Sequence, residues 1–284
     1  MSLIPSAPAT FTELVDAYAA TVTAVLDLGR ALLPGEEDLP TDCPGWTVGD
    51  QVRHVESVEA MVLGEPVPDV DVSGHAHVRH DFGRVVEQYL QSRRDRPLAE
   101  VLDALDTALQ RRLTALGDPA TTPQDPTVGP LGPTTVADLV ALRTFDIWCH
   151  EQDIREAVHR PGGQDTPAAA VALARVFGVF GKVVAKDAAI PPGRAVVLES
   201  TGPVRARVGC RVEVDPETGR ARGIPLAGDE SNPDAAVPTT TITMSTQALM
   251  RRAAGRRSTD ELQWSAVGDQ ALARQVLDAL AVTP

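Results

Sequence analysis

Apolar residues recur at helical spacing through the first two-thirds of the chain. The helices that this spacing predicts cover about residues 11–33, 47–63, 81–116, 135–159 and 166–186, with an interruption of the third near Pro97. Thr47 and Thr135 are each followed by an aspartate three residues later, which resembles a capping box and marks two of the helix starts. Segments rich in proline and glycine separate the helices.

The periodicity changes near residue 191. Short β-branched segments at 195–199, 204–214 and 239–244 predict strands, and helical patterns return at about 245–254 and 269–280. Strands and helices within this short stretch indicate a small α+β domain. We therefore expect an α+β protein of two domains, a helical domain over residues 1–190 and an α+β domain over 191–284.

Composition and charge narrow the function classes. The 284 residues include 39 acidic and 26 basic side chains, a net charge of −13, which argues against nucleic acid and against an anionic membrane surface as partners. No run of 18 apolar residues is present, so we expect no membrane span. The first residues do not resemble a signal peptide, and three scattered cysteines form no disulfide framework. These features favour a cytoplasmic location.

Ionisable residues lie on the apolar stripe of the helix predicted at 135–159. Asp146 and His150 are four residues apart and thus one above the other, and Arg143 falls on the same stripe. An unpaired buried ion costs several kcal/mol, so these groups need partners. A carboxylate and an imidazole placed in this way can bind one metal ion.

The only histidine of the helix predicted at 47–63 is a candidate third ligand. His54 lies beside the apolar stripe of that helix, and a bundle core would bring it to Asp146 and His150. Three protein ligands leave a coordination position open, as in catalytic zinc sites. The alternative is a buried hydrogen bond between Asp146 and His150 with His54 exposed. The histidine-rich loop at His75, His77 and His80 is a weaker metal candidate, because it has no carboxylate at helical register.

Several motifs resemble the mycothiol-dependent maleylpyruvate isomerase family. They are Cys43-Pro44-Gly45-Trp46-Thr47-Val48 with Asp50 and His54, the segment Asp146 to Asp153, the segment His77 to Glu87, and the C-terminal Ala254-Gly255-Arg256 and Val267-Gly268-Asp269. The resemblance implies a DinB-like four-helix bundle that binds a divalent metal, usually zinc, followed by a sterol-carrier-like domain. The family usually has glutamate where this chain has Asp146.

The resemblance also implies a thiol cosubstrate, mycothiol, which belongs to actinobacteria. Only two of the 26 basic residues are lysines, a bias that suits a high-GC genome. A bound dication deprotonates a coordinating thiol, and the thiolate can then attack an electrophilic small molecule. The expected activity is that of a mycothiol-dependent isomerase or S-transferase, acting as a monomer or homodimer.

Further residues have candidate roles in this chemistry. Arg79, Arg84 and Arg143 are candidates for holding carboxylates of the substrate or thiol, although Arg143 is equally suited to a salt bridge with Asp146 or with another helix. Asp153 is a candidate acceptor for His150. We expect Trp46 and Trp148 to pack in the core, and Cys149 not to act as a nucleophile. Two alternatives remain: a non-catalytic lipid-binding, small-molecule-binding or regulatory protein, and a metal-hydroxide hydrolase or lyase.

Overall fold

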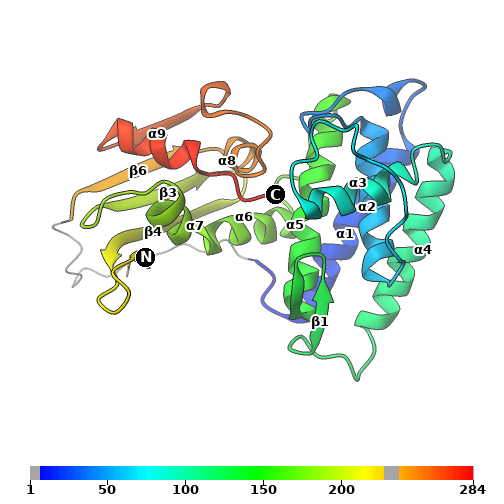
Figure 1. The fold of residues 1–284 in the computed structure, drawn as a ribbon, viewed down its shortest axis with the longest axis horizontal. Coiled ribbons are helices and arrows are strands. Elements are labelled where there is room, and N and C mark those ends of the chain that lie inside the picture. The colour runs from blue at the N-terminus through cyan, green and yellow to red at the C-terminus, as the bar shows by residue number, and fades with distance from the viewer. Residues whose placement is uncertain (1–6, 227–236, 284) are drawn as a thin grey trace. The chain divides into compact units, whose positions relative to one another are not determined.

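The computed structural model describes residues 7–226 and 237–283, which form two compact units. The first unit covers residues 8–163 and the second begins at Gln164 (Figure 1). The division thus falls after Gly163, whereas we expected a boundary near residue 190. The N-terminal residues that we judged unlike a signal peptide, 1–6, lie outside the described part of the chain.

The first unit is helical with one small hairpin. Its elements are α1 Phe11–Arg30, η1 Glu36–Asp38, α2 Val48–Val62, α3 Asp81–Gln91, α4 Leu98–Leu116, β1 Pro126–Gly129, β2 Gly132–Thr135 and α5 Val136–Ala157. The sequence predicted a helical stretch over 81–116 with an interruption near Pro97. The interruption is confirmed, because α3 ends at Gln91 and α4 begins at Leu98. The antiparallel hairpin β1–β2 lies in a stretch that we predicted as loop.

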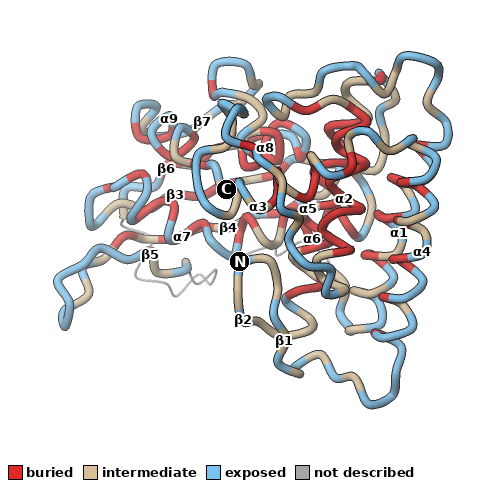
Figure 2. The backbone as a smooth tube through the Cα atoms, turned by 45° about the vertical axis from the view of Figure 1, so that its right-hand side comes forward, coloured by how far each residue is buried: buried red, intermediate tan, exposed pale blue. Residues whose placement is uncertain are grey.

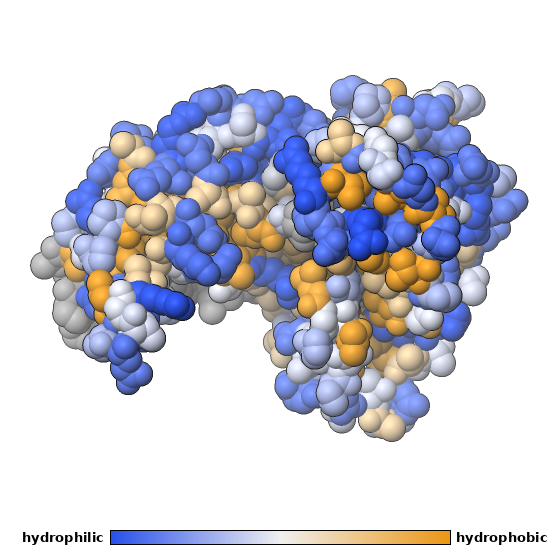
Figure 3. Space-filling model, viewed as in Figure 1, coloured by the Kyte–Doolittle hydropathy of each residue, from blue (hydrophilic) through white to orange (hydrophobic). Residues whose placement is uncertain are grey.

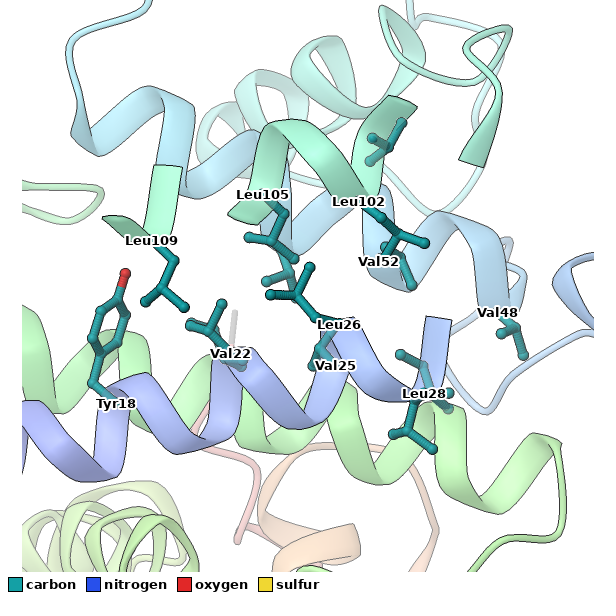
Figure 4. Close-up of a cluster of buried hydrophobic side chains, with 14 of the residues drawn as sticks. Tyr18, Val22, Val25, Leu26, Leu28, Val48, Val52, Leu102, Leu105 and Leu109 are labelled. Carbon is teal, nitrogen blue, oxygen red and sulfur yellow. The ribbon is translucent and has the colours of Figure 1, made fainter. Parts of the chain in front are cut away.

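Four helices of this unit pack around one apolar cluster. Helix α1 packs against α4 and α5, and α2 packs against the same two helices. Their buried side chains interdigitate, as Figure 4 shows for Tyr18, Val22, Val25, Leu26, Leu28, Val48, Val52, Leu102, Leu105 and Leu109. Removal of this apolar surface from water is the main driving force for folding of the unit.

Helix starts agree with the capping residues seen in the sequence. The Thr47 side chain accepts a hydrogen bond from the Asp50 backbone amide, and the Asp50 carboxylate accepts one from the Thr47 backbone amide, so the capping box is complete. Thr135 caps α5 by accepting from the Asp138 amide. These caps fix where the two helices that carry the candidate metal ligands begin.

In its described residues, the second unit contains a mixed sheet and six helical segments that precede or follow its strands. Its elements are α6 Pro167–Gly178, α7 Phe180–Lys182, η2 Val183–Asp187, β3 Ala195–Thr201, β4 Arg205–Val214, β5 Ala221–Pro225, β6 Thr239–Met244, α8 Thr246–Ala253, η4 Thr259–Glu261, β7 Trp264–Val267 and α9 Gln270–Asp278. The described strands are ordered β5-β4-β3-β6-β7, with β3 and β6 parallel and the other neighbours antiparallel. The α+β prediction is confirmed, although β5 and β7 were not predicted.

One segment of the second unit is apolar enough to resemble a membrane span. Among the described residues, Pro167–Asp187 alone is long and apolar enough to cross a membrane by length and composition. The sequence showed no uninterrupted apolar run of this length, because Arg175, Lys182 and Lys186 lie within the segment. Most of the segment is buried within the protein, as in the core helix of a globular unit (Figure 2).

Burial is densest where the candidate ligands lie. Every residue of α2 from Val48 to Ala60 is buried, and so are the residues of α5 from Ile147 to Ile154 (Figure 2). Hydrophilic side chains cover much of the visible surface, with apolar ones interspersed (Figure 3). Polar side chains inside α2 and α5 are therefore enclosed by protein and must find partners there.

Candidate metal centre

Helices α2 and α5 bring His54, Asp146 and His150 together, as the sequence predicted. One nitrogen from each imidazole and one carboxylate oxygen lie within 4.8 Å of one another. His54 Nε2 is 3.4 Å from Asp146 Oδ2, and His150 Nε2 is 3.6 Å from Asp146 Oδ1. The carboxylate thus offers a separate oxygen to each histidine. The alternative with an exposed His54 is wrong, since only 6% of its side chain is exposed.

His54 is the least satisfied of the three side chains. Both of its ring nitrogens are buried, and neither makes a hydrogen bond of normal geometry within the described residues. Burial, and then the nearby His150, lower the pKa of His54 to about 4, so the ring is neutral at pH 7. Histidine binds a metal ion as a neutral imidazole, through a ring nitrogen whose lone pair is not engaged in a hydrogen bond.

His150 is oriented from its other nitrogen. Its Nδ1 lies 2.5 Å from Gln51 Oε1, which can only accept, so Nδ1 carries the hydrogen. Gln51 is itself held by donating to Thr41 Oγ1 over 2.7 Å. Asp153 Oδ2 lies 3.5 Å from the same Nδ1, the place we expected for it. In the neutral ring Nε2 then keeps its lone pair, and this nitrogen is the one near Asp146.

Asp146 is charged and partly open to solvent. Burial opposes ionisation, but the Arg143 guanidinium and the adjacent His150 outweigh it and hold the pKa of Asp146 well below its ordinary value. Arg143 Nη1 donates to Asp146 Oδ2 over 2.6 Å. The Asp146 side chain is 31% exposed, whereas the two imidazoles are 6% exposed. Solvent therefore reaches the three residues from the Asp146 side.

Arg143 takes part in a buried network and not only in a pair. Its Nε donates to Glu59 Oε1 over 2.8 Å, and Glu59 Oε2 accepts from the Tyr18 hydroxyl over 2.6 Å. Arg112 Nε lies 3.5 Å from the same Glu59 oxygen. The sequence left two roles open for Arg143, a salt bridge and the binding of a substrate or thiol carboxylate. The contacts of Arg143 match the salt bridge.

Trp46 forms one wall of the site. Its ring centroid is 4.8 Å from that of His54 and 5.8 Å from that of His150. Its indole nitrogen donates to Glu87 Oε2 over 3.1 Å. Trp46 also packs against Val86, so it is part of a small apolar cluster, as we expected, and borders the candidate ligands as well.

A second group of possible ligands lies in the histidine-rich loop. His75, His77 and Glu87 offer atoms within 4.8 Å of one another. The carboxylate that the sequence did not place there comes from α3. Glu87 is already in contact with Arg94 Nη1 at 2.7 Å and with His77 Nε2 at 2.9 Å. A cation here would have to displace Arg94, so this group suits ion pairing better than metal binding.

The remaining candidates lie apart from this chemistry. Arg79 and Arg84 are exposed, and the ion pair of Arg84 is with Asp81 on its own helix, at 3.4 Å. Trp148 is buried and donates to the Gly163 carbonyl over 2.8 Å, in agreement with a packing role. Gln51 and Glu59 were missed. Gln51 is three residues before His54, a spacing that places both on one face of a helix. Glu59 is five residues after His54 and gives no such signal, and only the fold shows that it faces Arg143 of α5.

Part of the chain matches a known protein family. Residues 18–155, which include all three candidate ligands, match the family model described as the mycothiol maleylpyruvate isomerase N-terminal domain. No curated protein sequence matches the chain.

Two solved structures are similar in fold. One is a mycothiol-dependent maleylpyruvate isomerase, at 14% identity and a TM-score of 0.50, with 92% of this chain and 94% of that chain covered. The other is a histidine-to-alanine mutant of a mycothiol-dependent maleylpyruvate isomerase, at 11% identity and a TM-score of 0.51, with 90% and 93% covered. The family model thus identifies residues 18–155 of this chain as a mycothiol maleylpyruvate isomerase N-terminal domain.

Proposed function

We propose that this protein is a metal-dependent and mycothiol-dependent enzyme that activates a thiol for attack on an electrophilic small molecule. The observation that carries the proposal is the convergence of ligand atoms of His54, Asp146 and His150 within 4.8 Å, with both His54 ring nitrogens buried and without a hydrogen bond to any residue that the structure describes. The family match supports the thiol, because the similar solved structures are described as mycothiol-dependent isomerases. The reaction is an isomerisation or an S-transfer.

The donor set fits a divalent metal, most simply zinc. Two imidazoles and one carboxylate are the ligands of many catalytic zinc sites, and three protein ligands leave room for one exogenous ligand. When bound, such a cation supplies positive charge that favours the thiolate form of a coordinating thiol near pH 7. Asp146 is the most solvent-accessible of the three side chains at 31% exposure, so we propose that a thiol approaches from its side.

The protein residues have distinct tasks in this proposal. His54, Asp146 and His150 hold the cation, and Gln51 with Asp153 keeps His150 turned so that Nε2 faces Asp146. Trp46 covers the two imidazoles on one side and excludes water from them. Arg79 and Arg84 are exposed cations that are available to a substrate carboxylate.

The finer architectural and cellular assignments belong to the same proposal. We assign the helical unit to the DinB-like four-helix bundles and the second unit to the sterol-carrier-like domains. We also propose a cytoplasmic, actinobacterial protein that acts as a monomer or homodimer and binds neither nucleic acid nor membranes. The acidic composition supports the last point.

The first experiment measures metal content in the purified protein. Elemental analysis should give about one divalent ion per chain, and both His54→Ala and His150→Ala should lose it. The matched control is His159→Asn, an exposed histidine beyond the end of α5 whose backbone has a φ of 54°, which asparagine tolerates. Full metal content in both ligand variants after dialysis would disprove the site.

The second experiment tests the thiol. Mass spectrometry detects the adducts of an S-transfer, and chromatography detects the isomers formed by an isomerisation. With a panel of electrophiles, the two methods should show turnover with mycothiol and metal together, little with glutathione, and none without thiol. Glutathione should act poorly because the remote part of the cosubstrate supplies binding energy that positions the sulfur. Turnover that is independent of thiol would overturn the proposal in favour of a hydrolase or lyase, and a metal-free protein without turnover would favour a binding protein.

A further inference from the structure

Glu59 is a fully buried carboxylate at the meeting point of three other helices. It is 0% exposed on α2, and its oxygens contact Arg143 of α5, Tyr18 of α1 and Arg112 of α4. Isolated carboxylates are almost never buried in this way, because the loss of hydration costs several kcal/mol. The contacts with two arginines and a hydroxyl explain why Glu59 is tolerated in the core.

The Glu59 contacts lead directly to the candidate metal ligands. Arg143 bridges Glu59 Oε1, 2.8 Å from its Nε, and Asp146 Oδ2, 2.6 Å from its Nη1. Asp146 Oδ2 is also the oxygen that lies 3.4 Å from His54 Nε2. One guanidinium therefore fixes the oxygen that faces His54.

Glu59 itself is not placed to be a ligand. It is five residues after His54, so the two side chains leave α2 about 140° apart around the helix axis. Both of its oxygens are already engaged by protein donors. The side chain that contacts both Glu59 and a candidate ligand is Arg143.

The net charge around Asp146 depends on Glu59. Without Glu59, the positive charges of Arg143 and Arg112 would be opposed only by Asp146, and the group would carry a net positive charge that repels a cation. An unopposed Arg143 would also draw both Asp146 oxygens to itself. With Glu59 present, its negative charge offsets part of the positive charge of the two arginines, so Asp146 keeps more of its negative charge for the cation.

We propose that Glu59 is a positioning residue which compensates and orients Arg143, so that Arg143 holds Asp146 toward His54 and His150 without cancelling its charge. The inference rests on the metal site of the proposed function. Groups around ligands that act in this manner typically change metal affinity by about 10- to 100-fold.

The test is a set of metal-affinity measurements on the apo protein, by competition with a chromophoric chelator. Glu59→Gln, which keeps the shape and removes the charge, should weaken affinity by about 10- to 100-fold. Combining it with Arg143→Gln removes both charges, and the double variant should bind metal more tightly than Glu59→Gln alone. Such coupling distinguishes a role through Arg143 from general loss of structure.

Two further variants keep the test decisive. Tyr18→Phe removes a hydrogen bond to the other oxygen of Glu59 but leaves its charge and the Arg143 contact, so metal affinity should stay within about twofold of the wild type. Glu59→Asp retains the charge and should bind metal more tightly than Glu59→Gln. If Glu59→Gln does not fold, the order of affinities among wild type, Glu59→Asp and Tyr18→Phe takes its place, with only Glu59→Asp weakened.

The outcomes separate this inference from the proposed function. Wild-type protein that binds no metal overturns both. Wild-type protein that loses metal in His54→Ala but binds it equally well in Glu59→Gln overturns the positioning role alone. An affinity loss in Glu59→Gln that is undiminished in the Arg143→Gln background also overturns it, because Glu59 would then not act through Arg143.

Discussion

Asp146 combines three properties that are rarely found in one carboxylate. It is ionised, because Arg143 and His150 hold its pKa well below the ordinary value against the effect of burial. It offers one oxygen to each of two imidazoles, and it is 31% exposed while they are nearly covered. The charge of Asp146, and not its shape alone, should therefore determine whether a cation is retained.

Substitutions at Asp146 separate charge from shape. Asp146→Asn keeps the size and removes the charge, so metal affinity should fall by at least about 10-fold, whereas Asp146→Glu should keep or improve it. The longer side chain of glutamate matches the residue usual in the family at this position. The measurement is a metal titration, with Asp138→Asn, exposed in the first turn of the same helix, as the control. Equal affinities in all variants would place Asp146 outside the coordinating set.

At the scale of elements, helix α2 depends on its first turn. Its N-terminal amides are capped by Thr47, and no side chain of α2 before Met61 is open to solvent. Thr47→Ala should lower the free energy of unfolding by about 1 kcal/mol, because a backbone amide loses its partner. Thr107→Ala, an exposed mid-helix position of α4 where alanine is the better helix former, should be neutral or slightly stabilising. Thermal unfolding followed by circular dichroism measures both, and equal effects would contradict the capping role.

Two glycines bring α7 and β5 into backbone contact. A Cβ added at Gly223 would lie 2.5 Å from the Gly181 carbonyl oxygen, and one at Gly181 would lie 3.0 Å from the Gly223 oxygen. Neither clash involves a side chain that can rotate away, so Gly223→Ala should destabilise the protein by about 1–3 kcal/mol. Gly178→Ala, at the end of α6 with nothing within 4 Å, should not destabilise it. Chemical denaturation of the two variants provides the comparison.

The elements that sequence predicted and those it missed differ in a physical way. Helices α2 and α5 were visible because threonine caps and apolar spacing are local signals, and the spacing of Asp146 and His150 follows from one helix. The strands β1, β5 and β7 have only four or five residues and are defined by pairing with partners elsewhere in the chain. Such pairing leaves almost no pattern within the strand itself.

The same distinction holds for the site. His54 was found because it is the only histidine of its helix, yet its meeting with Asp146 depends on how α2 packs against α5. Glu59 and Gln51 were missed because α2 is buried on all sides, so a polar residue there has no exposed face to be assigned to. A sequence pattern can locate the apolar face of an amphipathic helix. It cannot show which neighbouring helix covers each side of a helix that is buried all round.

At the scale of the whole molecule, the division after Gly163 has a consequence for the metal site. Every residue of the candidate centre and its supporting network, from Tyr18 to Asp153, lies within residues 8–163. The apolar segment Pro167–Asp187 instead belongs to the second unit, where α6 packs against α8 and α7 packs against β4 and β5. Two truncated chains distinguish this division from the boundary at residue 190 that the sequence suggested.

A chain of residues 8–163 should fold as a monomer and bind about one divalent ion with the affinity of the full-length protein, because it keeps the apolar cluster and all three ligands. A chain of residues 8–190 should form aggregates or contain less metal after purification. It keeps the alanine, valine and phenylalanine side chains of Pro167–Asp187, which are buried in the full-length protein, but lacks the strands that cover them. Size-exclusion chromatography with elemental analysis of the eluted peak measures both properties. His54→Ala in the shorter chain is the control for bound metal. If the longer chain is the well-behaved monomer and the shorter one aggregates, then the helical unit extends to residue 190 and Pro167–Asp187 is part of its core.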